Sequence, residues 1–244
     1  MFRPPYLAAL ALALIAQTVS AQTSQPVSLH FDVRYGLFRP AQVHLAITDD
    51  PQSYAASGLV RSSGLLGLLR PFHFDLRTEG ARDGDTLRPQ TYIGDMDTGW
   101  RQVQVDMQYI NGVPQIRHIA PDEPHHPWSL TPDDMAGTVD LMTALYRVAR
   151  PQPRDALCDW SLETFDGRRH ARLALQPARE DPDGRHVTCE AAYIRVAGYS
   201  PADMADRLSY PFTLTYAETS TDAWQLMQAV AQTPYGRVRI LRRD

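Results

Sequence analysis

The sequence predicts a mainly β protein: a single curved antiparallel sheet, or open half-barrel, of about eleven strands with one helix covering its open side. Apolar and polar residues alternate through most of residues 27–241, which is the pattern of strands with one buried and one solvated face. Asp-Gly and Asn-Gly pairs separate several of these runs and are typical of hairpin turns. Because so many consecutive strands would leave open edges, the sheet must curl, or else divide into two facing sheets.

The N-terminal half contains seven predicted strands. Residues 27–35 alternate strictly before a glycine, and they form the first strand. Residues 63–69 are rich in leucine and glycine and predict a short apolar turn or helix. Asn111-Gly112 is the signature of a type I′ hairpin turn. The other strands of this half are expected at residues 41–48, 53–62, 72–82, 86–94, 100–110 and 113–119.

Residues 132–150 form the predicted helix. Thr131 is a cap residue, Pro132 takes the first helical position and two acidic residues follow, as is typical of a helix start. Pro151 ends the helix. One face carries apolar side chains at helical spacing, namely Leu141, Met142, Leu145 and Val148.

The C-terminal part begins with three strands within residues 158–201. Two Asp-Gly pairs, at residues 166–167 and 183–184, predict tight turns between them. The composition of residues 223–233 suits a helix as well as a strand, so the pattern alone leaves this segment open. A helical turn after Ser200 and strands at 210–218 and 237–241 complete the prediction.

Residues 1–21 have the features of a cleaved signal peptide: a positive charge, apolar residues 7–15 and a small-residue site that ends at Ala21. We therefore expect residues 22–244 to form a single β-rich domain in the periplasm. The alternative is that the apolar segment is retained as a membrane anchor. No later segment approaches the ~20 apolar residues of a transmembrane helix, so none is expected after the signal is removed.

The composition excludes several functions. The formal net charge is −4 at pH 7, which argues against a nucleic-acid partner because phosphate binding needs a basic surface. The chain contains no lysine, so Schiff-base chemistry on lysine is excluded. No motif for a nucleophile, a zinc ion or a nucleotide is present. We predict no catalytic residue, no metal site and no cofactor.

Two kinds of polar cluster are weighed as sites. The carboxylates at residues 49–50, and the pair Asp95 and Asp97, lie at expected strand ends, where acidic turn residues are common. His125-His126 lies on a proline-rich loop. A stable zinc site needs three or four converging ligands, so these histidines are expected to be solvated rather than bound to metal.

Several segments resemble those of one bacterial envelope family. They are a cysteine leading into FDGRR, a second cysteine followed by RVAGY, RYGLFRPAQVHL at 34–45, LRPQTY at 87–92, PWSL at 127–130 and TPYGRVRI at 233–240. The chain is therefore similar to the family named domain of unknown function 3108 (DUF3108). The resemblance implies a secreted, mostly β domain akin to lipoprotein-carrier half-barrels, and it favours a strand at residues 223–233. It implies no reaction and no catalytic residues.

Cys158 and Cys189 are the only cysteines, and a lone pair in an exported protein favours a disulfide. Closing the loop between them contributes roughly 3.5–4 kcal/mol in the chain-entropy model. In a flat meander one strand would separate them by ~9.6 Å, whereas a disulfide needs Cα atoms within ~6.8 Å. Either Cys158 lies on the lead-in to its strand and swings over, or the strands are not a simple meander.

The candidate ligand groove consists of apolar residues from the two irregular segments and from the helix: Leu65, Leu66, Leu69, Trp128, Leu141, Met142 and Leu145. Such residues can gate an apolar cavity, which predicts a lipid or lipopeptide as the ligand. Alternatively they only plug the sheet as core. The expected role is a non-enzymatic cell-envelope protein that binds an apolar ligand or, with envelope proteins, supports envelope assembly. The alternative from a different class is a hydrolase of envelope polymers with carboxylates in the concave face.

The first testable prediction is the site of signal cleavage. N-terminal sequencing of the protein from a periplasmic extract is expected to begin at Gln22, because small residues precede it. Recovery in the membrane fraction alone, with Met1 intact, would contradict this prediction.

Overall fold

A computed structural model describes residues 25–64, 67, 71–180, 182, 184–219, 223–234 and 236–243. The predicted signal peptide, residues 1–21, lies outside the described residues. So do three of the candidate groove residues, Leu65, Leu66 and Leu69.

The described strands form one sheet of 14 strands, in the order β7-β6-β5-β4-β3-β2-β1-β14-β13-β12-β11-β10-β9-β8. The predicted class, a single large and mainly antiparallel sheet, is confirmed. The first meander consists of β1 (Val27–Tyr35), β2 (Phe38–Asp49), β3 (Ser53–Ser62), β4 (His73–Asp83), β5 (Thr86–Asp97), β6 (Gln102–Ile110) and β7 (Val113–Ala120). The second consists of β8 (Val139–Asp140), β9 (Trp160–Phe165), β10 (His170–Glu180), β11 (His186–Ala197), β12 (Ser209–Glu218), β13 (Trp224–Thr233) and β14 (Gly236–Arg243).

The sheet contains more strands than the eleven predicted, and two of the additional strands are β13 and β8. Residues 224–233, left open on the residues alone, form β13 between β12 and β14. The short β8 pairs with β9 in parallel, through Val139 opposite Thr164. Every other strand pair in the sheet is antiparallel.

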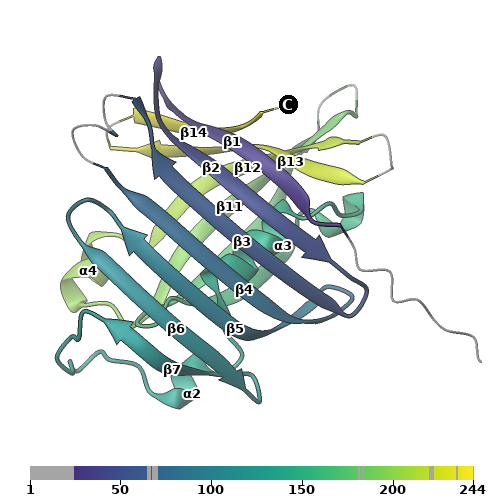
Figure 1. Ribbon diagram of the computed structural model, residues 1–244. Helices are drawn as coiled ribbons and strands as arrows, with labels where there is room; N and C mark the ends of the chain where they lie inside the picture. The colour runs from purple at the N-terminus through teal and green to yellow at the C-terminus, as the bar shows by residue number, and fades with distance from the viewer. Residues whose placement is uncertain are drawn as a thin grey trace, which may run out of the picture.

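The first and last strands lie side by side in the middle of the sheet. β1 pairs with β14 in antiparallel register, with Val33 opposite Ile240. This pairing joins the two meanders into one surface, which bends so that β2–β6 and β9–β12 lie on opposite sides of helix α3 (Leu141–Ala149) (Figure 1). The helix contacts strands of both meanders, among them β3, β4, β9 and β13. The helix was predicted to cover the open side of the sheet, and it lies within the curve of the sheet, in contact with strands of both meanders.

The edge strand β8 and loops beside both edges of the sheet make contacts across the gap between β7 and β8, which are not paired. β5 and β8 are in contact, and the Gly137 N–H donates to the Gly112 carbonyl at 3.0 Å. Arg168 pairs with Glu123 at 3.1 Å where the β9–β10 turn meets the loop after β7. The sheet is therefore an open half-barrel. Side chains and loops, rather than backbone pairing, bridge the gap between its two edge strands.

The predicted helix over residues 132–150 is wrong in its extent. Its first turn is α2 (Pro132–Met135), with the expected cap formed by Thr131 and Asp134. The chain leaves the helical path at Ala136, whose backbone is extended, and Gly137 follows with a φ of +76°. The chain then adds β8 to the sheet edge before α3 begins after Asp140. The helix breaks because a positive φ is incompatible with a continuous right-handed helix.

Two of the predicted tight turns can be compared with the structure, and Asp183 of the third lies outside the described residues. Asn111 and Gly112 both have positive φ, at 52° and 77°, as a type I′ turn requires. The predicted tight turn at 166–167 is instead a longer loop, in which only Gly167 has positive φ. The carboxylate of Asp166 accepts from the Arg168 and Arg169 N–H groups at 2.9 and 2.8 Å, so the side chain organises this turn. After Ser200, the predicted helical turn is present as α4 (Pro201–Asp206).

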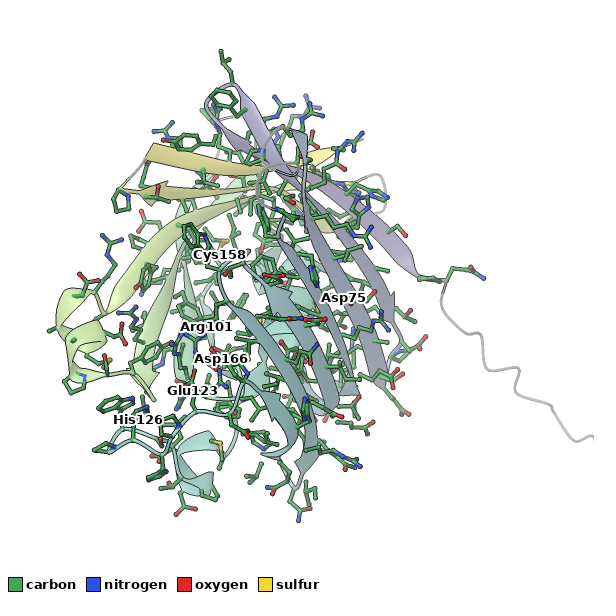
Figure 2. All side chains as sticks on the ribbon, turned by 60° about the vertical axis from the view of Figure 1, so that its left-hand side comes forward. Asp75, Arg101, Glu123, His126, Cys158 and Asp166 are labelled. Carbon is green, nitrogen blue, oxygen red and sulfur yellow. A yellow bond between two sulfur atoms is a disulfide. The ribbon has the colours of Figure 1, made fainter. Side chains whose placement is uncertain are left out.

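Cys158 and Cys189 form a disulfide with a Cα–Cα distance of 5.7 Å (Figure 2). Cys158 lies on the lead-in to β9, which is the first of the two expected geometries. Asp159 has a positive φ of 67° and redirects the chain there. The cysteine can therefore reach across β10 to β11, which the flat-sheet spacing would forbid.

Removing the disulfide is expected to destabilise the protein by about 3–4 kcal/mol, since the unfolded chain regains the freedom of the closed loop. Thermal unfolding of Cys158→Ser and Cys189→Ser under non-reducing conditions should show a similarly lowered Tm. Wild-type protein reduced before unfolding serves as the control and should match the variants. Two freely alkylated thiols in the protein purified without reductant would contradict the bond.

Candidate functional site

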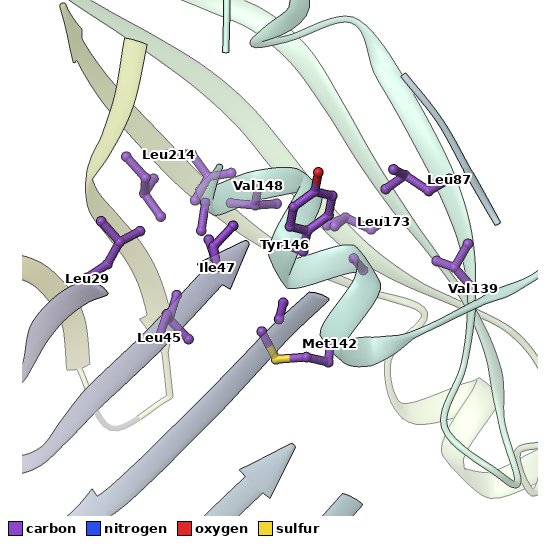
Figure 3. Close-up of a cluster of buried hydrophobic side chains, with 14 of the residues drawn as sticks. Leu29, Leu45, Ile47, Leu87, Val139, Met142, Tyr146, Val148, Leu173 and Leu214 are labelled. Carbon is purple, nitrogen blue, oxygen red and sulfur yellow. The ribbon is translucent and has the colours of Figure 1, made fainter. Parts of the chain in front are cut away.

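An apolar cavity of about 440 Å³ lies between helix α3 and the concave face of the sheet. Both meanders contribute to its walls. The principal wall residues are Phe31, Val43, Leu45, Val60, Leu141, Leu145, Val148, Leu173, Phe212, Leu214, Leu226, Val230, Val238 and Ile240. Figure 3 shows Leu45, Leu173 and Leu214 on the strands around α3.

The two polar side chains in the cavity wall are both engaged in hydrogen bonds. The Thr164 hydroxyl donates to the Ala171 carbonyl at 3.0 Å. The Tyr193 hydroxyl bonds that of Tyr199 at 3.3 Å. Among the described residues, no carboxylate, imidazole or guanidinium lines this cavity. The described part of the wall is therefore mainly apolar, and its two polar side chains already have hydrogen-bond partners.

Two periodicities build these walls. Phe31 on β1 and Val43 and Leu45 on β2 follow the alternation of strands, so they all point to the concave side. On α3, Leu141, Leu145 and Val148 are spaced by four and three residues and share one face. The periodicity of the sequence therefore predicts which side chains form the strand wall and the helix wall. It does not predict that a cavity remains between the two walls.

The candidate groove residues separate in the structure. Leu141 and Leu145 line the cavity. Met142 is fully buried on a different face of α3. Its sulfur packs against Gly58 so closely that a Cβ added to this glycine would lie only 3.0 Å from the Sδ atom. Adjacent helical residues point about 100° apart, so Leu141 and Met142 cannot face one space.

Trp128 lies elsewhere, beside a second pocket of about 300 Å³ under the loop that follows β7. Its ring stacks on His126 with centroids 4.6 Å apart. Figure 2 shows His126 on this loop near Glu123. Within the described part of the chain, no three residues among His, Cys, Asp and Glu are placed to bind a metal ion.

A buried carboxylate caps the N-terminus of α3. Asp140 has no exposed surface, and it accepts from the Thr143 N–H and hydroxyl, both at 2.7 Å. The Thr78 hydroxyl on β4 donates to it at 3.0 Å, and the Tyr54 hydroxyl on β3 bonds the Thr143 hydroxyl at 2.9 Å. Burial raises the pKa of Asp140 to about 6, although the hydrogen bonds from Thr143 and Thr78 oppose this shift.

Glycine makes room for this network. A Cβ at Gly80 would lie 2.6 Å from the Tyr54 hydroxyl, which is closer than any side chain tolerates. Tyr54 in turn stacks on Tyr146 of α3, with ring centroids 4.6 Å apart. The helix is thus fixed to β3 and β4 through both polar and aromatic contacts.

The C-terminus of α3 is held by buried arginines. Arg147 and Arg150 are each 4% exposed, and both form ion pairs with Asp85. The Arg147 Nη2 atom lies 3.6 Å from the Asp85 carboxylate. The Tyr146 hydroxyl donates to Asp49 at 2.5 Å, and Arg82 also pairs with Asp49. Cations at this end are favoured by the helix dipole, which the sequence indicated by placing two arginines in the last turn.

The carboxylates considered for catalysis do not converge. Asp49 is held by Arg82 at the far end of α3. Asp95 lies 3.8 Å from His73, and Asp97 accepts from the Gly99 N–H at 2.7 Å. Sequence reasoning missed Asp140, although an aspartate directly before an apolar helical run is a cap signal.

None of the helices in the described ranges is both long and apolar enough to cross a membrane.

A family model described as "Protein of unknown function (DUF3108)" matches residues 30–182. Among solved structures, the chain is similar to a beta-barrel-like protein of domain of unknown function DUF1849 from Brucella abortus, at 8% sequence identity. That similarity covers 90% of this chain and 96% of the other, with a TM-score of 0.48. No curated protein matches the chain.

The Asp140 carboxyl makes stability depend on pH. Because its folded pKa of about 6 exceeds the unfolded value of about 3.9, its favourable contribution is complete below pH 4 and is lost as the pH rises through 6. Asp140→Asn keeps a cap residue but does not titrate. The free energy of unfolding of the variant minus that of wild type is expected to rise by about 2–3 kcal/mol between pH 4 and pH 7.

Urea unfolding at a series of pH values measures this difference. Any constant cost of the asparagine cancels between the two ends of the range. Parallel curves for the two proteins would show that Asp140 does not titrate as described.

Proposed function

The chain belongs to the DUF3108 family of proteins of unknown function, and we propose that it binds an apolar ligand, a lipid or lipopeptide, in the cavity beside α3. We further propose that it does so in the periplasm, as a non-enzymatic protein of the cell envelope. A disulfide between its two cysteines suits an oxidising compartment, and residues 1–21 resemble a signal peptide.

The observation that carries the proposal is the chemistry of the cavity wall. A space of about 440 Å³ surrounded by leucine, valine and phenylalanine side chains lies within the usual range of ligand pockets, about 300–1,000 Å³. Each methylene transferred from water contributes about 0.8 kcal/mol. An acyl chain of about ten methylenes would therefore gain about 8 kcal/mol before the entropic cost of association.

The same wall argues against a hydrolase. General acid–base catalysis requires a titratable group within hydrogen-bond reach of the substrate. Among the described wall residues only the Tyr193 hydroxyl can titrate, and burial raises its pKa well above the usual range. Two carboxylates near α3 are used elsewhere: the buried Asp140 caps the helix, and the partly exposed Asp49 pairs with Arg82.

Helix α3 serves in this proposal as a fixed wall rather than a plug. Polar networks anchor it at both ends, through Asp140 and through Arg147 and Arg150. A helix held this way leaves Leu141 and Leu145 facing open space. Preformed apolar space lowers the cost of binding, because little has to be ordered when the ligand enters.

Filling the cavity tests the proposal. A fluorescent fatty acid is expected to bind the wild-type protein with micromolar affinity. Ala229→Phe, which adds a ring to the cavity wall, should weaken binding by about tenfold or more, equal to about 1.4 kcal/mol. The matched control is Ala46→Phe, on the opposite face of β2, and it should bind as wild type does.

Lipid extracted from protein purified out of its native envelope, and identified by mass spectrometry, would name the ligand. Absence of both probe binding and co-purified lipid in the wild-type protein would disprove the carrier function.

A further inference from the structure

We propose that the tip of the β1–β2 hairpin docks on the surface of an anionic lipid bilayer. The tip consists of Leu37 and Phe38, which are 104% and 72% exposed. The hairpin projects at the top of Figure 1. This inference deepens the proposed function, because it names the surface with which a lipid carrier would exchange its ligand, but it rests on different residues.

The turn holds these side chains away from the protein. Tyr35 and Phe38 are directly opposite each other, so the loop contains only Gly36 and Leu37. Gly36 has a φ of +57°, and a glycine at the first central position is the mark of a type II′ turn. A two-residue turn is stiff, and it keeps Leu37 in solvent, where an apolar side chain gains nothing unless a partner covers it.

Arginines lie on the outer face of the sheet behind the tip, on β1, β2, β3 and β14. Arg34 and Arg239 are directly opposite each other on β1 and β14. Arg61 lies opposite Gln42, which lies opposite Asp32, so Arg61 shares this face. We call Arg34, Arg39, Arg61 and Arg239 the arginine patch.

The patch consists of arginines and is therefore positively charged, whereas the chain as a whole has a formal net charge of −4. The nearest carboxylate, Asp32, has a 5% exposed side chain and is enclosed by Arg34, Arg39 and Arg243. Like charges directly opposite on a sheet repel. Arg34 and Arg239 are such a pair, and Asp32 offsets part of the charge on Arg34. An anionic surface would remove this repulsion.

A bilayer fits the shape of the tip better than a protein does. A stable protein interface buries about 800 Å² on each partner, which two side chains cannot supply. Insertion at a membrane surface needs only a few apolar side chains together with basic residues that reach the phosphates.

The tip also lies at one end of the cavity. Tyr35 is the cross-strand neighbour of Phe38 on β2 and of Val238 on β14, and Val238 lines the cavity. Val60, next to Arg61, lines it too. Docking at the tip would therefore bring this end of the cavity close to the bilayer.

Co-sedimentation with vesicles tests the proposal. One set contains phosphatidylglycerol and phosphatidylcholine, and the other contains phosphatidylcholine alone. The wild-type protein is expected to bind the anionic set and to lose binding at high salt. Leu37→Ser combined with Phe38→Ser should weaken binding by about tenfold or more. Arg61→Gln combined with Arg239→Gln should weaken it by about 25-fold, at about fivefold for each arginine.

The matched control is Ile110→Ser, which alters an exposed side chain at the opposite end of the sheet and should bind vesicles as wild type does. All variants change exposed residues and should retain the wild-type Tm and fatty-acid binding in solution. Vesicle binding that is absent in wild type, or unchanged in the Leu37 and Phe38 variant, would overturn the docking proposal. A dimer dissolved by that variant would overturn it as well, in favour of contact between copies.

The two proposals fail separately. Loss of vesicle binding with intact fatty-acid binding concerns the tip alone, whereas loss of fatty-acid binding in wild type concerns the cavity.

Discussion

The pairing of β1 with β14 is the constraint on which the rest of the structure depends. It places the two ends of the described chain side by side and makes one sheet from two meanders. Without it, each meander would expose a long unpaired edge beside apolar residues such as Phe31 and Ile240. The cavity exists because both meanders then curve around the same helix, so its walls come from distant parts of the chain.

Helix α3 keeps that curved sheet from collapsing onto itself. Its core-facing residues Met142 and Tyr146 are fully buried, while charged groups fix its two ends. Buried charges are costly unless they are paired. Asp140 is therefore surrounded by hydroxyls and a backbone N–H, and Arg150 is paired with Asp85. These directional contacts set the position of the helix more narrowly than apolar packing would, and they leave space on its other face.

An apolar cavity and an exposed apolar tip at one end of the same sheet form a consistent pair. The cavity would hold the part of a lipid that avoids water, and the arginine patch would meet the part that carries charge. The described residues of the cavity wall are mainly apolar, as the proposed division requires. The Trp128 pocket, which has polar as well as apolar lining residues and lies under the loop after β7, plays no part in this scheme.

The sequence by itself determined the local elements of this protein. Alternation located β1 and β3 to the residue, proline and cap residues located α2, and short motifs identified the family. Tertiary structure decided the remainder. Residues 224–233 became a strand because β12 and β14 offered two partners. The predicted helix is broken at the positive φ of Gly137, after which Val139 pairs at the sheet edge. Which face of α3 borders the cavity followed from contacts between residues far apart in sequence, such as Thr78 with Asp140, and local periodicity carries no information about such contacts.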